Sequence, residues 1–164
     1  MKKVAVLMGS DSDLPIVEKG IAVLREYGVP HEVHVYSAHR TPTECAEFVR
    51  SAEASGFGVI IAAAGMAAHL AGAVAANTTL PVIGIPISSK NTGGMDALLA
   101  TVQMPSGMPV ATVAIDGAAN AALLAVEILA LSDNTLKEKL LAARQAGREK
   151  VLEKNRKIEE QFNA

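Results

Sequence analysis

The sequence predicts an α/β fold in which helices cover both faces of a parallel sheet. Five short apolar runs are continuous rather than alternating, as is typical of strands buried on both faces. Helical stretches separate these runs, so strands and helices alternate along the chain. With 164 residues, the chain is long enough to bury one core without disulfides or metal.

The expected elements follow in order along the chain. We expect strands at residues 3–8, 31–36, 58–64, 81–85 and 109–115. The second strand, HEVHVY, partly alternates between polar and apolar residues, which favours a position near a sheet edge. We expect helices at residues 13–27, 42–55, 67–77, 93–103 and 118–131. Right-handed crossovers would then give a three-layer α/β/α sandwich with a five-stranded sheet.

The segment from residue 134 to residue 162 differs from the rest because it is long, charged and helical in pattern. Its apolar stripe is thin and consists of Leu136, Leu140, Ala143, Gly147 and Val151. So narrow a stripe can lie on the surface of the domain itself or contact a neighbouring subunit. The pattern leaves both possibilities open.

Composition excludes several classes of protein. The net charge of −2 lacks the basic surplus of a nucleic-acid binder, and only two Tyr, three Phe and no Trp are available to stack on bases. The apolar run at residues 4–8 is too short for a signal peptide, and no apolar stretch is long enough to span a membrane. The single Cys45 rules out an internal disulfide. We expect a cytoplasmic protein with no nucleic-acid or membrane partner.

In an open parallel sheet, ligands bind beyond the carboxyl ends of the strands. The loop GSDSD at residues 9–13 follows the first strand, and its hydroxyls and N–H groups can hold a phosphate. It is neither a P-loop nor a GxGxxG motif, and helix capping by Ser12 or Asp13 is an equal alternative. Because a carboxylate repels a phosphate, we expect Asp13 to accept hydrogen bonds from sugar hydroxyls instead.

The loop SAHRTP follows the second strand and supplies a cation. Arg40 can hold a phosphate with its forked donors, assisted by Ser37. Thr41 and Pro42 are typical of a helix start, with threonine as the N-cap and proline at the first helical position. That structural role leaves His39 and Arg40 unexplained.

The loop AGMAAHL follows the third strand, with Gly65 where a ligand ring can approach the backbone and His69 in the first turns of a helix. His69 taken alone is more typical of a packed polar residue, but its expected nearness to His39 favours a function. We interpret His31 and His34 as surface or core polar residues. Two histidines without further ligands do not predict a metal site. Neither Cys45 nor a GxSxG serine supports a nucleophile, which leaves acid/base chemistry by histidine on a small phosphorylated ligand.

Taken together, GSDSD, SAHRTP, AGMAAHL, PVIGIP, VQMPSGMPVATVAI and NAALLA resemble the N5-carboxyaminoimidazole ribonucleotide mutases of purine biosynthesis. The resemblance runs from Val4 to Ala130. It implies a flavodoxin-like sandwich that assembles as an octamer, works without metal or organic cofactor, and depends on an ATP-dependent enzyme for its substrate. It also implies a catalytic domain at residues 1–132 and a helical extension at residues 133–164 that packs on a neighbouring subunit.

The resemblance also implies roles for individual residues. His39 would be the general acid/base, Asp13 would hold the ribose, and residues 88–96 would close over the site. The remaining roles would be phosphate binding by Ser10, Ser12, Ser37 and Arg40, and shaping of the pocket by Gly65, its neighbours and His69.

Two departures and three rival functions bear on this interpretation. Met66 and Ala71 stand where the family usually has glycine and proline, so Met66 would either enter the pocket or turn into the core. The nearest rival is a carboxylase that adds free CO₂ to aminoimidazole ribonucleotide, although the forms SAHRTP and AAHL favour the mutase. A phosphoreceiver lacks its acceptor aspartate after the third strand, and a flavin carrier lacks the aromatic residues on which its ring would stack.

Overall fold

The computed structural model describes residues 1–163, and its centre is a five-stranded sheet whose neighbouring strands pair in parallel. The strand order across the sheet is β2-β1-β3-β4-β5. The strands are β1 (Lys3–Met8), β2 (His31–Val35), β3 (Phe57–Gly65), β4 (Val82–Ile87) and β5 (Ala111–Thr112). The predicted fold class is confirmed, and β2 lies at an edge as the alternation in its sequence indicates.

Strand β5 is much shorter than the predicted strand at residues 109–115. The N–H of Val113 donates to the carbonyl of Gly84 (3.1 Å), and the N–H of Asp116 donates to that of Pro86 (2.9 Å). The two donors, Val113 and Asp116, are three positions apart, whereas the two acceptors on β4 are only two positions apart. Such a mismatch interrupts the regular ladder, as in a β-bulge.

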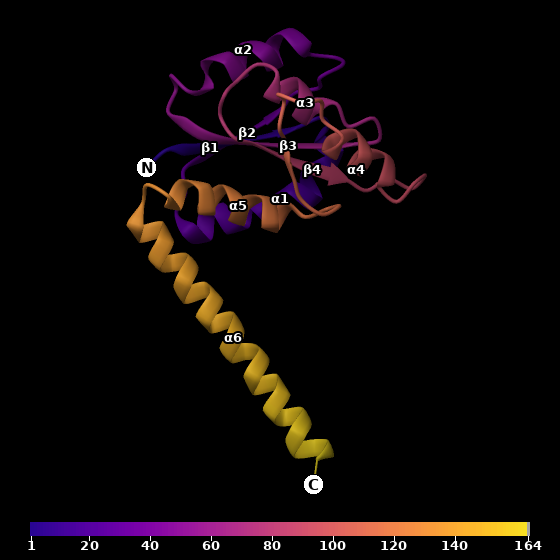
Figure 1. Cartoon of the computed structure of the whole chain (residues 1–164). Helices are drawn as coiled ribbons and strands as arrows, with labels where there is room; N and C mark the ends of the chain where they lie inside the picture. The colour runs from indigo at the N-terminus through magenta and orange to yellow at the C-terminus, as the bar shows by residue number, and fades with distance from the viewer. Residues whose placement is uncertain (164) are drawn as a thin grey trace.

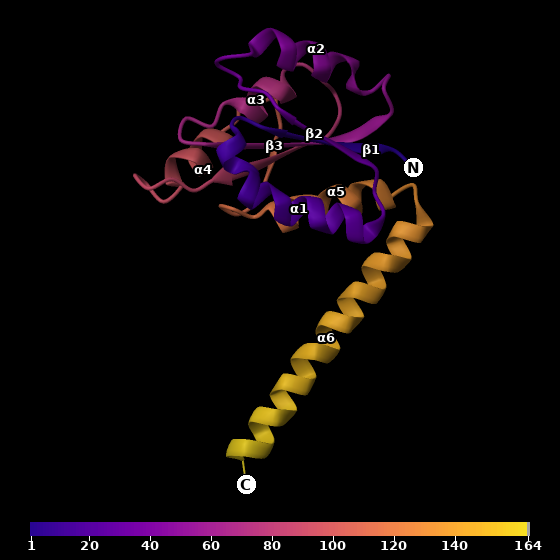
Figure 2. The ribbon, with the colours of Figure 1, turned by 180° about the vertical axis from the view of Figure 1, so that it is seen from behind.

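Helices cover both faces of the sheet. Figure 1 shows α1 and α5 on one face and α2 and α3 on the other, and the same layers are seen from behind in Figure 2. The helices are α1 (Leu14–Tyr27), α2 (Pro42–Ala52), α3 (Leu70–Ala75), α4 (Met95–Val102), α5 (Ala118–Ala130) and α6 (Asn134–Phe162), with a short 3₁₀ helix at Asp11–Asp13. Most of the predicted helices form with shorter bounds, α3 and α4 because each is preceded by a turn.

The core is divided by the sheet into two layers, because successive strand residues point to opposite faces. Val4 and Val6 pack in the layer beneath α1 and α5, whereas Ala5 and Leu7 pack in the layer beneath α2 and α3. All four are almost completely buried. A Cβ placed on Gly20 of α1 would lie 2.7 Å from the carbonyl oxygen of Ala118 on α5, so glycine allows these two helices their close contact.

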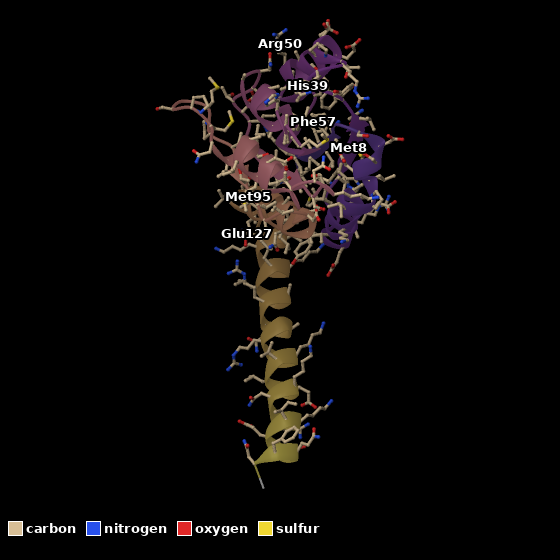
Figure 3. All side chains as sticks on the ribbon, turned by 90° about the vertical axis from the view of Figure 1, so that its right-hand side faces the viewer. Met8, His39, Arg50, Phe57, Met95 and Glu127 are labelled. Carbon is tan, nitrogen blue, oxygen red and sulfur yellow. The ribbon has the colours of Figure 1, made fainter. Side chains whose placement is uncertain are left out.

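Helix α6 leaves the body of the molecule after its first turns (Figures 1 and 3). Leu136 is fully buried, and Asp133 caps the helix by accepting a hydrogen bond from the N–H of Leu136 (3.2 Å). The Lys139 ammonium donates to the carbonyl of Tyr27 (2.8 Å). Val151 further along is 65% exposed. The predicted stripe therefore packs on its own domain at its start and lies exposed beyond it.

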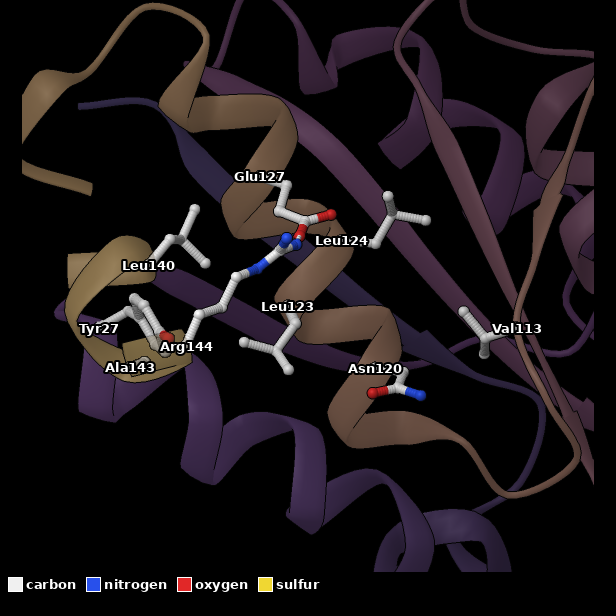
Figure 4. A pocket seen from close by; sticks show the side chains of 9 residues that line it. All are labelled: Tyr27, Val113, Asn120, Leu123, Leu124, Glu127, Leu140, Ala143 and Arg144. Atoms are coloured by element: carbon white, nitrogen blue, oxygen red, sulfur yellow. Dashed lines mark hydrogen bonds and ion pairs between the residues drawn. The ribbon is translucent and has the colours of Figure 1, made fainter. Parts of the chain in front are cut away.

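A cavity of about 490 Å³ lies at the junction of α1, α5 and α6. Figure 4 shows its mostly apolar lining around Glu127 and Arg144, whose side chains form an ion pair (2.6 Å). The ion pair is exposed, so it contributes little to stability. None of the residues predicted for the functional site lines this cavity.

The register of the sheet places four strand ends side by side. Met8 pairs with Val35 of β2 and with Ala63 of β3, and Gly65 pairs with Ile87 of β4. Because the strands are parallel, the loops that follow β1 to β4 all emerge at the same edge of the sheet.

Candidate active site

A cleft of about 640 Å³ opens at the carboxyl ends of β1, β2, β3 and β4. All eight residues predicted for the functional site line it, namely Ser10, Ser12, Asp13, Ser37, His39, Arg40, Gly65 and His69. The fold thus brings together side chains from three loops that are distant in the sequence.

His39 and His69 face each other across the cleft. His39 Nε2 lies 2.7 Å from His69 Nδ1, with the two rings nearly perpendicular at 83°. A hydrogen bond between two imidazoles requires an N–H on one ring and an unprotonated nitrogen on the other. One proton is therefore shared by two exposed rings, one from the β2–α2 loop and the other from the β3–α3 loop.

The position of His69 differs slightly from the prediction. His69 is the N-cap of α3 and lies just before the helix rather than within its first turns. Its N–H donates to the carbonyl of Ala67 (2.9 Å), and this turn delays the start of the helix. His69 is exposed, so it is not the packed polar residue that the sequence allowed as an alternative.

The first loop folds into a hydroxyl cluster around Ser10. Ser10 caps the 3₁₀ helix, and its Oγ accepts hydrogen bonds from the N–H of Ser12 (3.3 Å) and from Ser12 Oγ (2.8 Å). Of the predicted alternative caps, Asp13 does occupy the N-cap position of α1, whereas Ser12 lies within the 3₁₀ helix. The side chain of Asp13 makes no capping hydrogen bond to α1, and the side-chain cap in this loop is that of Ser10 on the 3₁₀ helix.

Asp13 carries a buried carboxyl group, with only 7% of the residue exposed. Burial raises the pKa of Asp13, because removal from water disfavours the charged form. Hydrogen bonds from Ser10 and Ser12 oppose that rise of the pKa only in part. The carboxylate can therefore still accept hydrogen bonds, and hydroxyl groups of a ligand would stabilise it.

Arg40 connects the first two loops. Its backbone N–H and its Nε donate to Ser37 Oγ (3.2 and 3.5 Å), and its Nη2 donates to the carbonyl oxygen of Gly9 (3.3 Å). These donor–acceptor distances are at the long end of the range for hydrogen bonds, so the contacts are weak. The exposed guanidinium therefore keeps donors available for an anion. Arg40 thus places a positive charge between the strand ends of β1 and β2.

Thr41 plays a different structural role from the predicted one. It occupies the N-cap position of α2, followed by Pro42 at the first helical position, as the sequence predicts. Its hydroxyl makes no capping bond to the helix. Instead, Thr41 Oγ1 accepts from the N–H of Ser37 (2.9 Å) and donates to the carbonyl of Ser37 (3.2 Å). Thr41 therefore fixes the loop that carries His39.

The third loop provides a wall of small residues and one unusual methionine. A Cβ placed on Gly65 would lie 3.3 Å from the carbonyl oxygen of Ile87, so a larger residue would crowd the end of β4. Met66 has φ = 55°, a left-handed conformation that bulky residues rarely adopt. Its side chain lines the cleft and the residue is 58% exposed, so it does not turn into the core. Ala71, the other departure, is buried.

Some lining residues escaped the sequence analysis. Gly9 contributes a carbonyl group, and Leu70 and Ile87 contribute apolar surface. Gly9 follows β1 and Ile87 ends β4, whereas Leu70 begins α3, and none of the three has a polar side chain that would mark it in the sequence. Ser88 and Ser89, which begin the predicted closing loop, also line the cleft.

The other candidates lie away from the cleft. Within residues 1–163, no group of three or more His, Cys, Asp and Glu side chains is placed to hold a metal ion. Cys45 is buried in α2, and burial raises the pKa of its thiol, which disfavours a nucleophilic thiolate. His34 packs against the Tyr36 and Phe48 rings (centroids 5.5 and 4.6 Å apart), as expected for a core polar residue.

These features define a class of α/β protein in which small-ligand sites lie at the carboxyl edge of a parallel sheet, and here a histidine pair and an arginine line that edge. The sequence profile of the AIR carboxylase family matches residues 3–150. The chain therefore belongs to the AIR carboxylase family.

Individual relatives agree with this assignment. The N5-carboxyaminoimidazole ribonucleotide mutase of Pyrococcus horikoshii is 54% identical over 157 residues, which cover 96% of this chain and 89% of that protein. The mutase of Methanocaldococcus jannaschii is 50% identical, with 97% and 99% covered. The crystal structure of Treponema denticola PurE superposes with a TM-score of 0.87 at 30% identity and covers 94% of this chain and 96% of that one. The resemblance drawn from the motifs is thus confirmed. None of the helices described here combines the length and the apolarity needed to cross a membrane.

Proposed function

We propose that the cleft interconverts N5-carboxyaminoimidazole ribonucleotide and 4-carboxy-5-aminoimidazole ribonucleotide. The observation that carries the proposal is the contact between His39 and His69 beside a cradle of hydroxyls and one arginine. Relatives at 50–54% identity that cover nearly the whole chain have the same mutase name. The roles below assign each part of the ribonucleotide to groups that line the cleft.

The phosphate would bind between the first two loops. Arg40 supplies the positive charge, and the hydroxyls of Ser10, Ser12 and Ser37 lie in the same cleft. A guanidinium can donate two parallel hydrogen bonds to a phosphate, which fixes its orientation as well as its position. These contacts would hold the ribonucleotide by its phosphate, which takes no part in the reaction at the imidazole ring.

The ribose would lie next to Asp13. Its buried carboxylate has few partners of its own, and ribose hydroxyls are donors that would complete its hydrogen bonding. With the phosphate and the ribose fixed, the imidazole ring would point toward Gly65, whose lack of a side chain leaves room beside the backbone.

His39 would move the protons of the reaction. When the bond between the exocyclic nitrogen and the carboxyl carbon breaks, CO₂ leaves and the nitrogen takes up a proton. CO₂ then bonds to the ring carbon, which loses its own proton. Histidine suits both steps, because its charge changes near neutral pH. At 2.7 Å from His39, the His69 ring can hold or return the same proton.

The free CO₂ must be retained until it reacts. A small neutral molecule cannot be held by charge, so retention requires a close and water-free wall. Ala64, Gly65 and Ala67, which line the cleft, would form one side of such a wall. Both histidines are exposed in the single chain, so closure needs further groups. We assign this role to the loop at residues 88–96 and to a neighbouring subunit.

Exposed apolar residues support an oligomer, which we propose to be an octamer. Met95, Leu99 and Val102 on α4 are each about half exposed (52, 50 and 48%). Ile158 and Phe162 on α6 are 57 and 68% exposed. We propose that the extension at residues 133–164 covers its apolar residues on a neighbouring subunit. Light scattering of the purified chain would measure the number of subunits, and a monomer would contradict this proposal.

The decisive experiment compares two substrates. Purified protein is given the N5-carboxylated ribonucleotide alone, or the uncarboxylated aminoimidazole ribonucleotide with and without bicarbonate. We expect formation of the 4-carboxy product from the first substrate without added bicarbonate. Turnover of only the uncarboxylated ribonucleotide with bicarbonate would support the carboxylase and overturn the mutase. In cells, an ATP-dependent enzyme would supply the labile N-carboxylated substrate.

A further inference from the structure

Asp116 lies in the turn between β5 and α5 and has an unusual backbone conformation. Its φ is 58°, and Met66 is the only other non-glycine residue with a positive φ among residues 1–163. Aspartate tolerates this left-handed region better than most residues, but glycine adopts it with less strain. Asp116 does not itself line the cleft. The contacts of its side chain should therefore explain why this position holds aspartate rather than glycine.

The side chain and the backbone of Asp116 both bind the segment where β4 ends. Asp116 Oδ1 accepts a hydrogen bond from the N–H of Ser88 (2.8 Å), a residue 28 positions earlier in the chain. The N–H of Asp116 donates to the carbonyl oxygen of Pro86 (2.9 Å). The turn thus holds the chain where it leaves β4 and enters the loop at residues 88–94.

The far end of the same loop returns to this turn. Gly94 is buried with φ = 94°, and a Cβ placed on it would lie 2.8 Å from Ile115 Cγ2 and 3.0 Å from Ser88 Cα. Within the loop, the N–H of Gly93 donates to the carbonyl of Ser89 (3.0 Å). Residues 90–93 between these anchors are exposed. Both ends of the loop, Ser88 and Gly94, therefore lie beside the turn that contains Asp116, whereas the middle of the loop is exposed to solvent.

The loop matters for the site because its first two residues, Ser88 and Ser89, line the cleft. We propose that Asp116 is a positioning residue for the reaction: its carboxylate fixes the first residues of loop 88–94 in the place from which this wall of the cleft helps to retain CO₂. The inference rests on the proposed function, because retention of CO₂ is what a fixed wall would serve.

A purely conformational role makes the opposite prediction. If Asp116 were only a turn residue, glycine would replace it without loss, since glycine adopts φ = 58° more easily. If the hydrogen bond to Ser88 matters, glycine fails and asparagine succeeds, because an amide oxygen accepts from the same N–H and asparagine tolerates the left-handed region. Asp116→Gly and Asp116→Asn therefore separate the two roles.

The matched control is Asp133→Gly. Asp133 also accepts a backbone N–H, that of Leu136 (3.2 Å), but it caps α6 outside the cleft lining. Its loss removes the same kind of hydrogen bond from a different part of the molecule. Any effect on the loop or on the reaction that is common to both glycine variants would be general destabilisation rather than positioning.

The first measurement is amide hydrogen exchange of residues 88–94 in the full-length protein without ligand. For Asp116→Gly we expect exchange roughly tenfold faster than in the wild type, as expected for one charged hydrogen bond lost at a surface site. Asp116→Asn should stay within about threefold, since an amide oxygen replaces the lost acceptor. Asp133→Gly should leave this segment unchanged. Equal exchange in Asp116→Gly and the wild type would overturn the proposal.

The second measurement is the fraction of consumed substrate that is released as uncarboxylated ribonucleotide and CO₂ rather than as the 4-carboxy product. We expect Asp116→Gly to raise this fraction several-fold and Asp116→Asn to keep the wild-type value. An unchanged fraction in Asp116→Gly would overturn the role in CO₂ retention. If the wild type itself shows no mutase turnover, the proposed function fails and that role falls with it, whereas the exchange experiment still decides whether Asp116 anchors the loop.

Discussion

The four histidines divide into two pairs in two regions of the molecule. His31 and His34 belong to the edge strand β2, where His34 packs against aromatic rings and lies 3.5 Å from a Glu32 oxygen. His39 and His69 belong to the loops at the carboxyl edge, where their rings contact each other in the cleft. The residue type is the same in both regions, but the surroundings differ completely.

The difference follows from where each histidine stands relative to the strand end. Within β2, hydrogen bonding to β1 fixes the backbone, and the side chains cover the sheet. Just beyond the strand, side chains from several loops converge on one edge and can meet a ligand. Position in the fold, more than residue type, separates a structural histidine from a candidate catalyst.

His39→Asn should give the largest effect on activity. Asparagine keeps a polar side chain of similar size but cannot carry a proton, so kcat should fall by roughly 10²–10⁴-fold, the usual contribution of general acid/base catalysis. Binding of the ribonucleotide should change little, because the variant leaves the phosphate contacts in place. Steady-state kinetics and calorimetry would measure the two quantities separately.

The matched control for that variant is His31→Asn on β2. His31 Nδ1 lies 2.9 Å from the carbonyl oxygen of Val29, far from the cleft lining. We expect its kcat to equal that of the wild type. A near-normal kcat in His39→Asn, or an equal loss in both variants, would contradict the contrast between the two regions.

Arg40→Ala should weaken ribonucleotide binding by about 1.5–3 kcal/mol, the range for one charged hydrogen bond, or roughly 10–150-fold in Kd. The loss should shrink as salt is raised, because salt screens an exposed charge. Arg50→Ala, an exposed arginine on α2 outside the cleft lining, provides the control and should leave Kd unchanged. Equal affinities for Arg40→Ala and the wild type would place the phosphate elsewhere.

The sequence predicted the sheet, the layers and the loops that line the cleft, because these depend on apolar periodicity and on polar groups that follow strands. The full assignment of roles to the eight candidate residues came from the resemblance to the mutase family. It did not predict the shortening of β5, since the mismatch with β4 involves hydrogen bonds between residues about 30 positions apart. The direction of the Thr41 hydroxyl was missed for a similar reason. Threonine can bond either to the helix it precedes or to the loop before it, and only the folded loop decides.

The contact between His39 and His69 was expected only as a proximity. The sequence shows that each follows a strand, but the 2.7 Å distance depends on the order β2-β1-β3 and on the turn at Ala67. Nothing in the sequence pattern indicated the hydrogen bond between Asp116 and Ser88, which are 28 positions apart. The roles of the site residues, the octamer and the cytoplasmic location stay predictions until they are measured.

Asp13→Asn should lower activity and raise stability, with the smaller of the two effects in stability. Asparagine keeps one acceptor oxygen but loses the charge and the second oxygen, so the weakened ribose contact should cost up to roughly tenfold in kcat/KM, as for one hydrogen bond to a charged group. The folded state raises the pKa of Asp13 above 3.8 by burial, so ionisation at neutral pH disfavours folding. Asparagine removes that cost.

The pH dependence gives this prediction a clear sign. At pH 3.5 the Asp13 carboxyl is mostly protonated in both the folded and the unfolded chain, so the wild type and Asp13→Asn should be closest in stability there. As the pH rises through the raised folded pKa, the wild type should lose stability relative to the variant. Urea unfolding at pH 3.5 and pH 7 would measure the difference. If the wild type were more stable relative to the variant at pH 7 than at pH 3.5, the interpretation of Asp13 as a buried carboxylate with few partners would be wrong.

Met66→Gly should have the smallest effect, a change in the free energy of unfolding. It tests whether the position of a methionine in the fold decides what the residue contributes, as it does for the histidines. At φ = 55°, methionine bears about 1–2 kcal/mol of strain that glycine does not. Glycine costs about 0.5–1 kcal/mol through the entropy of the unfolded chain, so Met66→Gly should leave the free energy of unfolding unchanged or raise it by up to about 1.5 kcal/mol. Met95 is similarly exposed (52%, against 58% for Met66) but begins the helix α4. There glycine should destabilise by up to about 1 kcal/mol, because of its low helix propensity. Thermal unfolding of both variants measures the contrast, and an equal loss of stability would mean that the Met66 side chain contributes contacts that outweigh its strain.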